Sequence, residues 1–160
     1  MIIREREPGD EDRIWATLEP VIRAGDSYTL PRDWSREQAL AHWLGPAMTT
    51  FVAEDDARVL GTYYLKANKQ GGGSHICNCG YVVHPDARGR GIARQMGEHS
   101  LKTAAAHGYK AMQFNSVVAT NTVALKLWAS LGFRQIGLIP KGFRHPTEGY
   151  VDALILYREL

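Results

Sequence analysis

The stretch from Cys79 to Arg94 constrains this chain most, because it predicts a strand, a basic turn and a helix start in direct succession. Residues 76–83 are apolar and β-branched over the length of one buried strand. His84-Pro85-Asp86 ends that strand, since proline cannot continue a ladder. Arg88-Gly89-Arg90-Gly91 then leads into a long helical pattern. The unpaired amides of a helix start, beside glycines and arginines, predict a site for an anion such as pyrophosphate.

Two other interpretations of this turn are weaker. A lone arginine–glycine turn is often only a solvated loop, but a position between a strand and a helix favours an anion site. A dinucleotide site would require G-x-G-x-x-G, whereas the turn reads Arg-Gly-Arg-Gly-Ile-Ala and its strand does not begin the chain.

Length and composition set the broad class. A chain of 160 residues suffices for one domain with a core, so we expect a single domain over residues 1–160. Hydrophobic content of 44% and charged content of 22% are typical of a soluble globular protein. A net charge of +2 gives no global argument for a nucleic-acid or membrane partner. Without a signal peptide or a spanning apolar run, the expected location is cytoplasmic.

The cysteines and histidines do not suggest a metal. Cys77 and Cys79 lie two apart in a predicted strand, so both point to one face and are expected to be buried core thiols in a reducing compartment. A nucleophilic cysteine is the alternative. The six histidines show no metal-ligand spacing, and no metal is expected.

Hydrophobic periodicity predicts the order β-α-α-β-β-β-α-β-α-β-β, a mostly antiparallel sheet with one central crossover. Strands are expected at 2–7, 49–54, 59–67, 76–83, 111–118, 133–139 and 150–157. Helices are expected at 10–24, after a cap at Asp33 or Ser35, at 91–107, and after a cap at Thr120 or Asn121. Pro20 should bend or end the first helix, Gly97 should pack against the sheet, and 140–149 should be a loop.

Two motifs resemble one family. Arg88-x-x-Gly91-x-Ala93 fits the R/Q-x-x-G-x-G/A signature of the GNAT acetyltransferases. Asn121-x-x-Ala124-x-x-x-Trp128-x-x-x-Gly132-Phe133 is similar to the family's second signature. The resemblance covers essentially the whole chain. It implies an α/β (α+β) GNAT fold, a mixed and mostly antiparallel sheet of about seven strands flanked by about four helices.

The resemblance also implies acetyl-CoA as cosubstrate. The pantetheine is expected to pair with the backbone of Tyr81, Val82 and Val83. The pyrophosphate is expected on Arg88, Gly89, Arg90, Gly91, Ile92, Ala93 and Arg94. Asn121, Ala124 and Trp128 should lie near the lower cofactor arm and the sulfur.

Two positions depart from the family pattern. Many members carry a tyrosine at Trp128, which can protonate the leaving thiolate, whereas an indole cannot. Trp128 could equally be a core aromatic. Many members carry a glutamate at Asn78 as a base, and an asparagine can only orient a water or substrate. The prediction is an enzyme that relies on positioning, with a water-mediated base or an amine that arrives neutral.

Asn115 is the second asparagine predicted to act in catalysis. It lies mid-strand, where a buried amide needs partners. It could bond across splayed strands or bind the acceptor. Residues 112–121 resemble the fungal proline-analogue (azetidine-2-carboxylate) acetyltransferases, in which the matching asparagine contacts the imino-acid acceptor. That similarity extends through residues 78–81 and 149–153.

Two loops are expected to complete the acceptor pocket. Residues 26–30, with Tyr28 and Thr29, resemble the acceptor loop of phosphinothricin-type members. Residues 141–146 should close the other side, where Arg144 or Lys141 could pair with a substrate carboxylate. His145 and His84 are candidate proton relays. Solvated turn charges are the alternative for Arg144 and Lys141, and a surface or cap role is the alternative for the histidines.

The sequence therefore predicts an N-acetyltransferase that moves the acetyl group of acetyl-CoA to a primary or secondary amine of a small molecule, such as an amino acid, imino acid or toxic analogue. A protein N-terminal or ribosomal-protein acetyltransferase is one alternative, and a non-catalytic acyl-CoA-binding regulator is another. A homodimer is possible.

Overall fold

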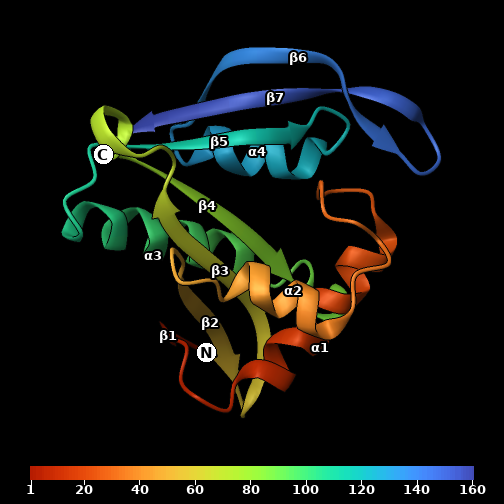
Figure 1. Cartoon of the computed structure of the whole chain (residues 1–160), viewed down its shortest axis with the longest axis vertical. Helices are drawn as coiled ribbons and strands as arrows, with labels where there is room; N and C mark the ends of the chain where they lie inside the picture. Colours follow the sequence, from red (N-terminus) through yellow and green to blue (C-terminus); the bar gives the residue numbers. More distant parts are fainter.

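Seven strands form one sheet in the order β1-β2-β3-β4-β5-β7-β6, and the computed structural model describes all residues, 1–160 (Figure 1). The strands are β1 (Ile2–Glu5), β2 (Thr49–Asp55), β3 (Arg58–Ala67), β4 (Ile76–Val83), β5 (Ala111–Val118), β6 (Arg134–His145) and β7 (Gly149–Glu159). The helices are α1 (Glu11–Ala24), α2 (Arg36–Trp43), α3 (Ile92–Ala106) and α4 (Thr122–Ser130). Only β4 and β5 pair in parallel. None of the helices combines the length and the apolar character needed to cross a membrane.

The predicted element order is confirmed, and β4 and β5 have the predicted bounds. The prediction of a loop over 140–149 was wrong, because β6 continues to His145. Lys141 adopts a positive φ of 52° and makes a bulge there, after which Phe143 pairs again with Val151. The helix α1 does not end at Pro20 but continues to Ala24.

Local signals set the helix starts and the hairpin. Ser35 begins α2 with a capping box, in which its side chain accepts from the Gln38 amide. Asn121 caps α4 by accepting from the Ala124 amide at 3.3 Å. The β2–β3 turn is made by Asp56 and Ala57, both at positive φ.

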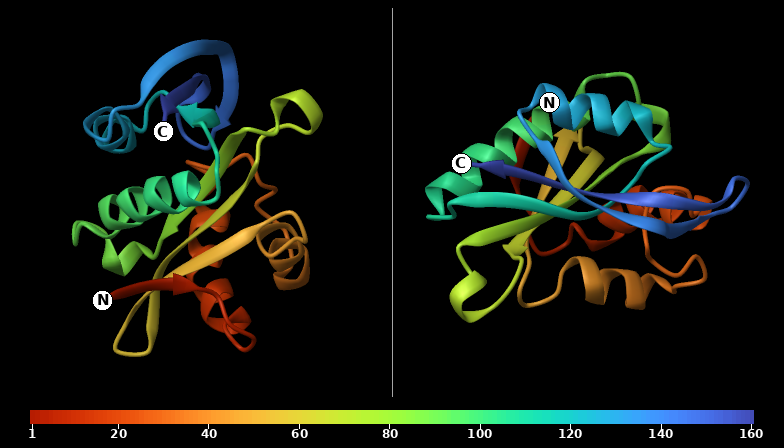
Figure 2. Two further views of the ribbon diagram at one scale, coloured as in Figure 1. Left: turned by 90° about the vertical axis from the view of Figure 1, so that its left-hand side faces the viewer. Right: turned by 90° about the horizontal axis from the view of Figure 1, so that it is seen from above.

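Two apolar cores cover the two faces of the sheet, and the helices that contribute to them lie on opposite faces (Figure 2). Residues of α1 and α2 pack on one face, and residues of α3 and α4 pack on the other. Because side chains alternate along β4, Cys77 and Cys79 are buried on the α3 side while Val82 faces α1 and α2. Gly97 allows close approach of α4 rather than of the sheet, since a Cβ there would lie 2.6 Å from Leu131 Cδ1.

The sheet opens between its two parallel strands. The β4–β5 ladder contains only the pairs Ile76–Ala111 and Cys77–Met112. Immediately beyond it, the Asn78 side chain donates from Nδ2 to the Gln113 carbonyl at 2.9 Å. The strands then diverge, and the wedge between them positions the site described below (Figure 1).

A buried carboxylate ties the first strand to the first helix. Asp10 is only 1% exposed and accepts two hydrogen bonds from Arg4, at 2.8 and 3.1 Å. The Glu7 amide donates at 2.8 Å, and Arg13 also pairs with the carboxylate. The Arg4 hydrogen bond, against the cost of burial, lowers the pKa of Asp10 from 3.8 to about 2.

We predict that Asp10→Asn lowers the free energy of unfolding by about 2 kcal/mol near neutral pH, because the depressed pKa makes the ionised form stabilising. That contribution is fully present above the unfolded-state pKa of 3.8 and is lost as the pH falls through about 2. Urea unfolding of the wild type and the variant between pH 6 and pH 2 should show converging stabilities.

Asp12→Asn, in the first turn of the helix that follows Asp10, is the control, since Asp12 pairs with Arg36 at a side-chain exposure of 86%. An exposed pair of this kind contributes at most about 1 kcal/mol. A constant Asp10→Asn deficit down to pH 2 would contradict the assigned role of the carboxylate.

Candidate active site

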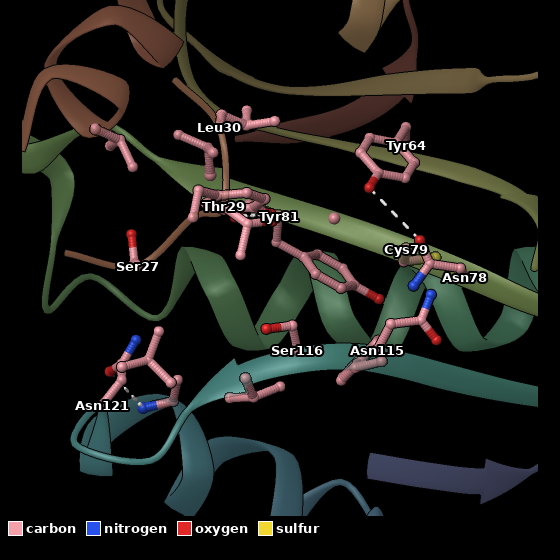
Figure 3. Close-up of a pocket in the computed structure, with 18 of the residues that line it drawn as sticks. Ser27, Thr29, Leu30, Tyr64, Asn78, Cys79, Tyr81, Asn115, Ser116 and Asn121 are labelled. Carbon is pink, nitrogen blue, oxygen red and sulfur yellow. Dashed lines mark hydrogen bonds between the residues drawn. The ribbon is translucent and has the colours of Figure 1, made fainter. Parts of the chain in front are cut away.

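Two adjoining cavities occupy the wedge and its mouth. The wedge cavity, of about 390 Å³, lies between β4 and β5 and is bounded by Tyr28, Tyr64, Asn78 and Asn115 (Figure 3). The turn cavity, of about 660 Å³, lies against the residues 87–94 turn and the start of α4. They share the lining residues Ser27, Tyr81, Val83, Arg88, Asn121, Ala124 and Trp128. A molecule extended along β4 could therefore reach from one cavity into the other.

The turn cavity presents unpaired backbone amides. No backbone N–H from Gly89 through Arg94 donates a hydrogen bond within the chain, and the first bond of α3 runs from the Gln95 amide to the Gly91 carbonyl. Gly89 and Gly91 have φ of 76° and 74°, so L side chains would be strained there. A Cβ at Gly89 would meet nothing within 4 Å. The predicted Ile92 and Ala93 also line this cavity, which suits an anion.

The three arginines of the turn differ in orientation. Arg88 lines both cavities and makes no side-chain hydrogen bond or ion pair within the chain. Arg94 lines the turn cavity and donates to Ser130 at 2.8 Å. Arg90 instead pairs with Asp55 at 2.9 Å and lines neither cavity. The structure therefore brings only two of the three predicted arginines to the site.

The backbone of β4 alternates between its two neighbours. The His84 amide bonds to Leu60 and the Ile76 carbonyl accepts from Asn68, so even-numbered residues face β3. The backbone amides of Tyr81 and Val83 therefore point toward the wedge, whereas the backbone amide of Val82 points toward β3. The Tyr81 carbonyl accepts a hydrogen bond from the Tyr28 hydroxyl at 2.9 Å.

Trp128 is both a core aromatic and a wall of the site. It is 7% exposed, and its ring centroid lies 4.8 Å from those of Tyr81 and Phe114. It nevertheless lines both cavities, as do Asn121 and Ala124 on the first turn of α4. Trp128 is thus a core aromatic that also reaches the cavities, and its contact with the cofactor stays a prediction.

The two predicted asparagines face each other across the wedge (Figure 3). Asn78 is 7% exposed, and the Tyr64 hydroxyl donates to its Oδ1 at 3.5 Å. Asn115 is exposed rather than buried, because β5 has already diverged from β4 at this point. Its Nδ2 donates to Asn68 at 2.7 Å, and its Oδ1 accepts from Gln113 at 3.0 Å. Asn78, not Asn115, makes the bond that bridges the splayed strands.

The phenol and thiol groups that line the wedge cavity keep their protons at neutral pH. Burial raises the pKa of the Tyr28 and Tyr81 phenols well above their usual value, and raises that of Tyr64 to about 12. Burial likewise raises the pKa of the Cys79 thiol. These groups are protonated at neutral pH, so Cys79 is not a ready nucleophile.

The residues of the wedge cavity that the sequence analysis missed include His42 from α2 and Tyr64 and Lys66 from β3. Burial, and then the Lys66 charge, lower the pKa of His42, so its imidazole is neutral at pH 7. No Asp or Glu lines this cavity. The position of Lys66 in β3, opposite Asn78, is the sequence signal that could have placed it at the cavity. Nothing in the sequence distinguished His42 from the other histidines.

Of the two loops predicted to complete the acceptor pocket, only the first lines the wedge cavity. Tyr28 and Thr29 line the wedge cavity as expected. Arg144 is exposed and lines neither cavity. His145 lines the turn cavity instead, where its Nδ1 accepts from the amides of Thr147 and Glu148, each at 3.2 Å. No group of three or more His, Cys, Asp or Glu side chains is arranged to hold a metal ion.

Comparisons with known proteins agree with this fold. N-acetyltransferase aca1 of Schizosaccharomyces pombe is 40% identical over 111 residues, which are 69% of this chain and 53% of that protein, so the chain spans about half the length of this curated relative. A GCN5-related N-acetyltransferase from Kribbella flavida is 40% identical, with a TM-score of 0.94 over 99% of this chain and 97% of that one. The structure of yncA from Salmonella typhimurium with its cofactor acetyl-CoA shares the fold, with a TM-score of 0.84 at 20% identity over 100% of this chain and 94% of that one.

A family model settles the assignment suggested by the two motifs and the splayed sheet. The model of the acetyltransferase (GNAT) family matches residues 14–133, which include the splayed strands, the basic turn and α4. The chain belongs to the GNAT acetyltransferase family.

Proposed function

We propose that this protein transfers the acetyl group of acetyl-CoA to the amine of a small molecule. The observation that carries this proposal is the junction of the two cavities at Tyr81, Val83 and Trp128. One cavity offers unpaired amides to an anion, and the other offers aromatic and amide groups to a compact polar ligand. Their meeting point is the place for a thioester and an amine to react.

The cofactor would be held by backbone more than by side chains. Its pyrophosphate would accept hydrogen bonds from the amides between Gly89 and Arg94, with Arg88 adding a free positive charge. Its pantetheine would pair with the wedge-facing amides of Tyr81 and Val83, as an added strand pairs with a free sheet edge. Asn121, Ala124 and Trp128 would contact the arm that leads to the sulfur.

The wedge cavity favours a small acceptor. Its walls combine phenols, three asparagines and apolar groups, and no carboxylate lines it to attract a basic peptide. This favours an amino acid, an imino acid or an analogue, as in the proline-analogue or phosphinothricin subgroups, over a protein N-terminus. Asn78 and Asn115 would position the acceptor, since amides cannot take its proton.

His42 is the group suited to accept the amine proton. The phenols and the Cys79 thiol keep their own protons at neutral pH, and the other ionisable residues of the cavity, Lys66 and Arg88, are cations. The neutral imidazole of His42 is therefore the basic uncharged side chain that lines the cavity. A general base at this position would supply the role that many family members give to a glutamate.

We predict that the purified protein releases CoA thiol from acetyl-CoA when supplied with a panel of amino-acid and imino-acid amines. Arg88→Gln should raise the KM for acetyl-CoA about tenfold by removing a charge-assisted contact. Arg90→Gln is the matched control and should change it less than about twofold, because Arg90 pairs with Asp55. Tight acetyl-CoA binding without release to any amine would support a non-catalytic regulator, and equal effects of the two variants would contradict the assigned cofactor site.

We further predict that kcat/KM rises with pH through the lowered pKa of His42, since only the neutral imidazole accepts a proton. His42→Gln should remove that inflection and reduce kcat/KM about a hundredfold. His99→Gln is the control, because burial also lowers the pKa of His99 but its ring contacts Tyr63 on the α3 side. A retained inflection in His42→Gln would exclude His42 as the base.

A further inference from the structure

Lys66 is a cation of the wedge cavity without a partner. It lines that cavity from β3, is only partly exposed, and makes no hydrogen bond or ion pair within the chain. The chain pairs many of its arginines with carboxylates, including Arg4, Arg13, Arg36 and Arg90. No lysine of the chain makes an ion pair, so Lys66 is distinguished by its place: its partly buried ammonium lies at the wall of a cavity that no carboxylate lines, where it is available to a negative group of a ligand.

The fold fixes where this ammonium lies. Lys66 is the cross-strand partner of Asn78, so the two side chains rise from the same face of the sheet. Tyr64, two residues earlier, rises beside them and donates to Asn78. Lys66 is also close enough to His42 to lower its pKa. Lys66 therefore lies beside Asn78, one of the residues that we propose to position the acceptor.

The charged side chains that line the wedge cavity are all positive. No Asp or Glu lines it, and its other cation, Arg88, lies where it joins the turn cavity. With Arg88 directed to the cofactor, Lys66 is left at the acceptor end. Such a site favours a ligand that carries a negative group and disfavours a polyamine, whose added charges would be repelled.

We propose that Lys66 binds a carboxylate of the acceptor, so that the substrates of this protein are amino or imino acids rather than simple amines. This inference rests on the proposed acetyl transfer and specifies its substrate class. Binding the carboxylate at Lys66 fixes one end of the acceptor, and the amide groups of Asn78 and Asn115 line the cavity beside it. One end held in this way leaves the amine to be presented to the thioester.

The test compares each acid with its carboxamide, which keeps the amine and removes the negative charge. The probes are L-proline with L-prolinamide and L-leucine with L-leucinamide, measured by CoA thiol release at saturating acetyl-CoA. The wild type should prefer each acid that it acetylates by about tenfold or more in kcat/KM, the usual range for a charge-assisted hydrogen bond. Lys66→Met should lose that preference through a higher KM for the acid, with the KM for the amide changed less than about twofold.

Two further variants separate recognition from structure. Lys66→Arg should keep most of the preference, since a guanidinium also pairs with a carboxylate. Lys69→Met should behave as the wild type, because Lys69 is exposed and lines neither cavity. A wild type that accepts amides as well as acids, or a Lys66→Met that loses both equally, would overturn the inference while leaving acetyl transfer intact.

Binding gives an answer that does not depend on turnover. The same acids and amides are titrated by calorimetry into the protein loaded with CoA. Binding of an acid that weakens about tenfold in Lys66→Met, but not in Lys69→Met, supports the carboxylate site even if no amine is acetylated. Acids that do not bind, or bind equally to all variants, contradict it.

Discussion

The early divergence of β4 and β5 is the constraint on which the site depends. After two residue pairs the ladder stops, and a single side-chain bond from Asn78 to Gln113 closes its end. Continued pairing would bury the amides of Tyr81 and Val83 in the sheet and would remove the wedge cavity. Because the strands separate, the chain keeps a free strand edge inside its own core, covered by α1 and α2 on one face and by α3 and α4 on the other.

The electrostatic character of the site follows from that geometry. Burial keeps the phenols of Tyr28 and Tyr64 protonated, and the basic turn and Lys66 supply positive charge. No carboxylate lines the wedge cavity to balance it. A glutamate at the Asn78 position would be buried next to Tyr64. The asparagine instead donates its amide to the Gln113 carbonyl and so holds the two strands together. Proton transfer is thereby left to a group from another element, and His42 fills that role in our proposal.

Much of the fold was readable from the sequence because its signals are local. The apolar run of β4, the His84-Pro85-Asp86 stop and the glycines of the turn depend on neighbouring residues only, and these predictions matched the structure. The orientation of Arg90 toward Asp55 could not be read in this way, because the pair joins positions far apart in the chain. The same holds for Lys66 and His42, which reach the wedge cavity through strand register and helix packing. The β6 bulge at Lys141 was missed because proline and glycine beside it are typical of loops.

Amide hydrogen exchange along β4, followed by NMR with and without acetyl-CoA, tests the central claim that the wedge is a free strand edge for the cofactor. Gly80 and Val82 face β3 and should be protected in both states. Tyr81 and Val83 should exchange faster without ligand and should become protected when acetyl-CoA is added. Protection of Tyr81 and Val83 without ligand, or no change at saturating acetyl-CoA, would contradict the account.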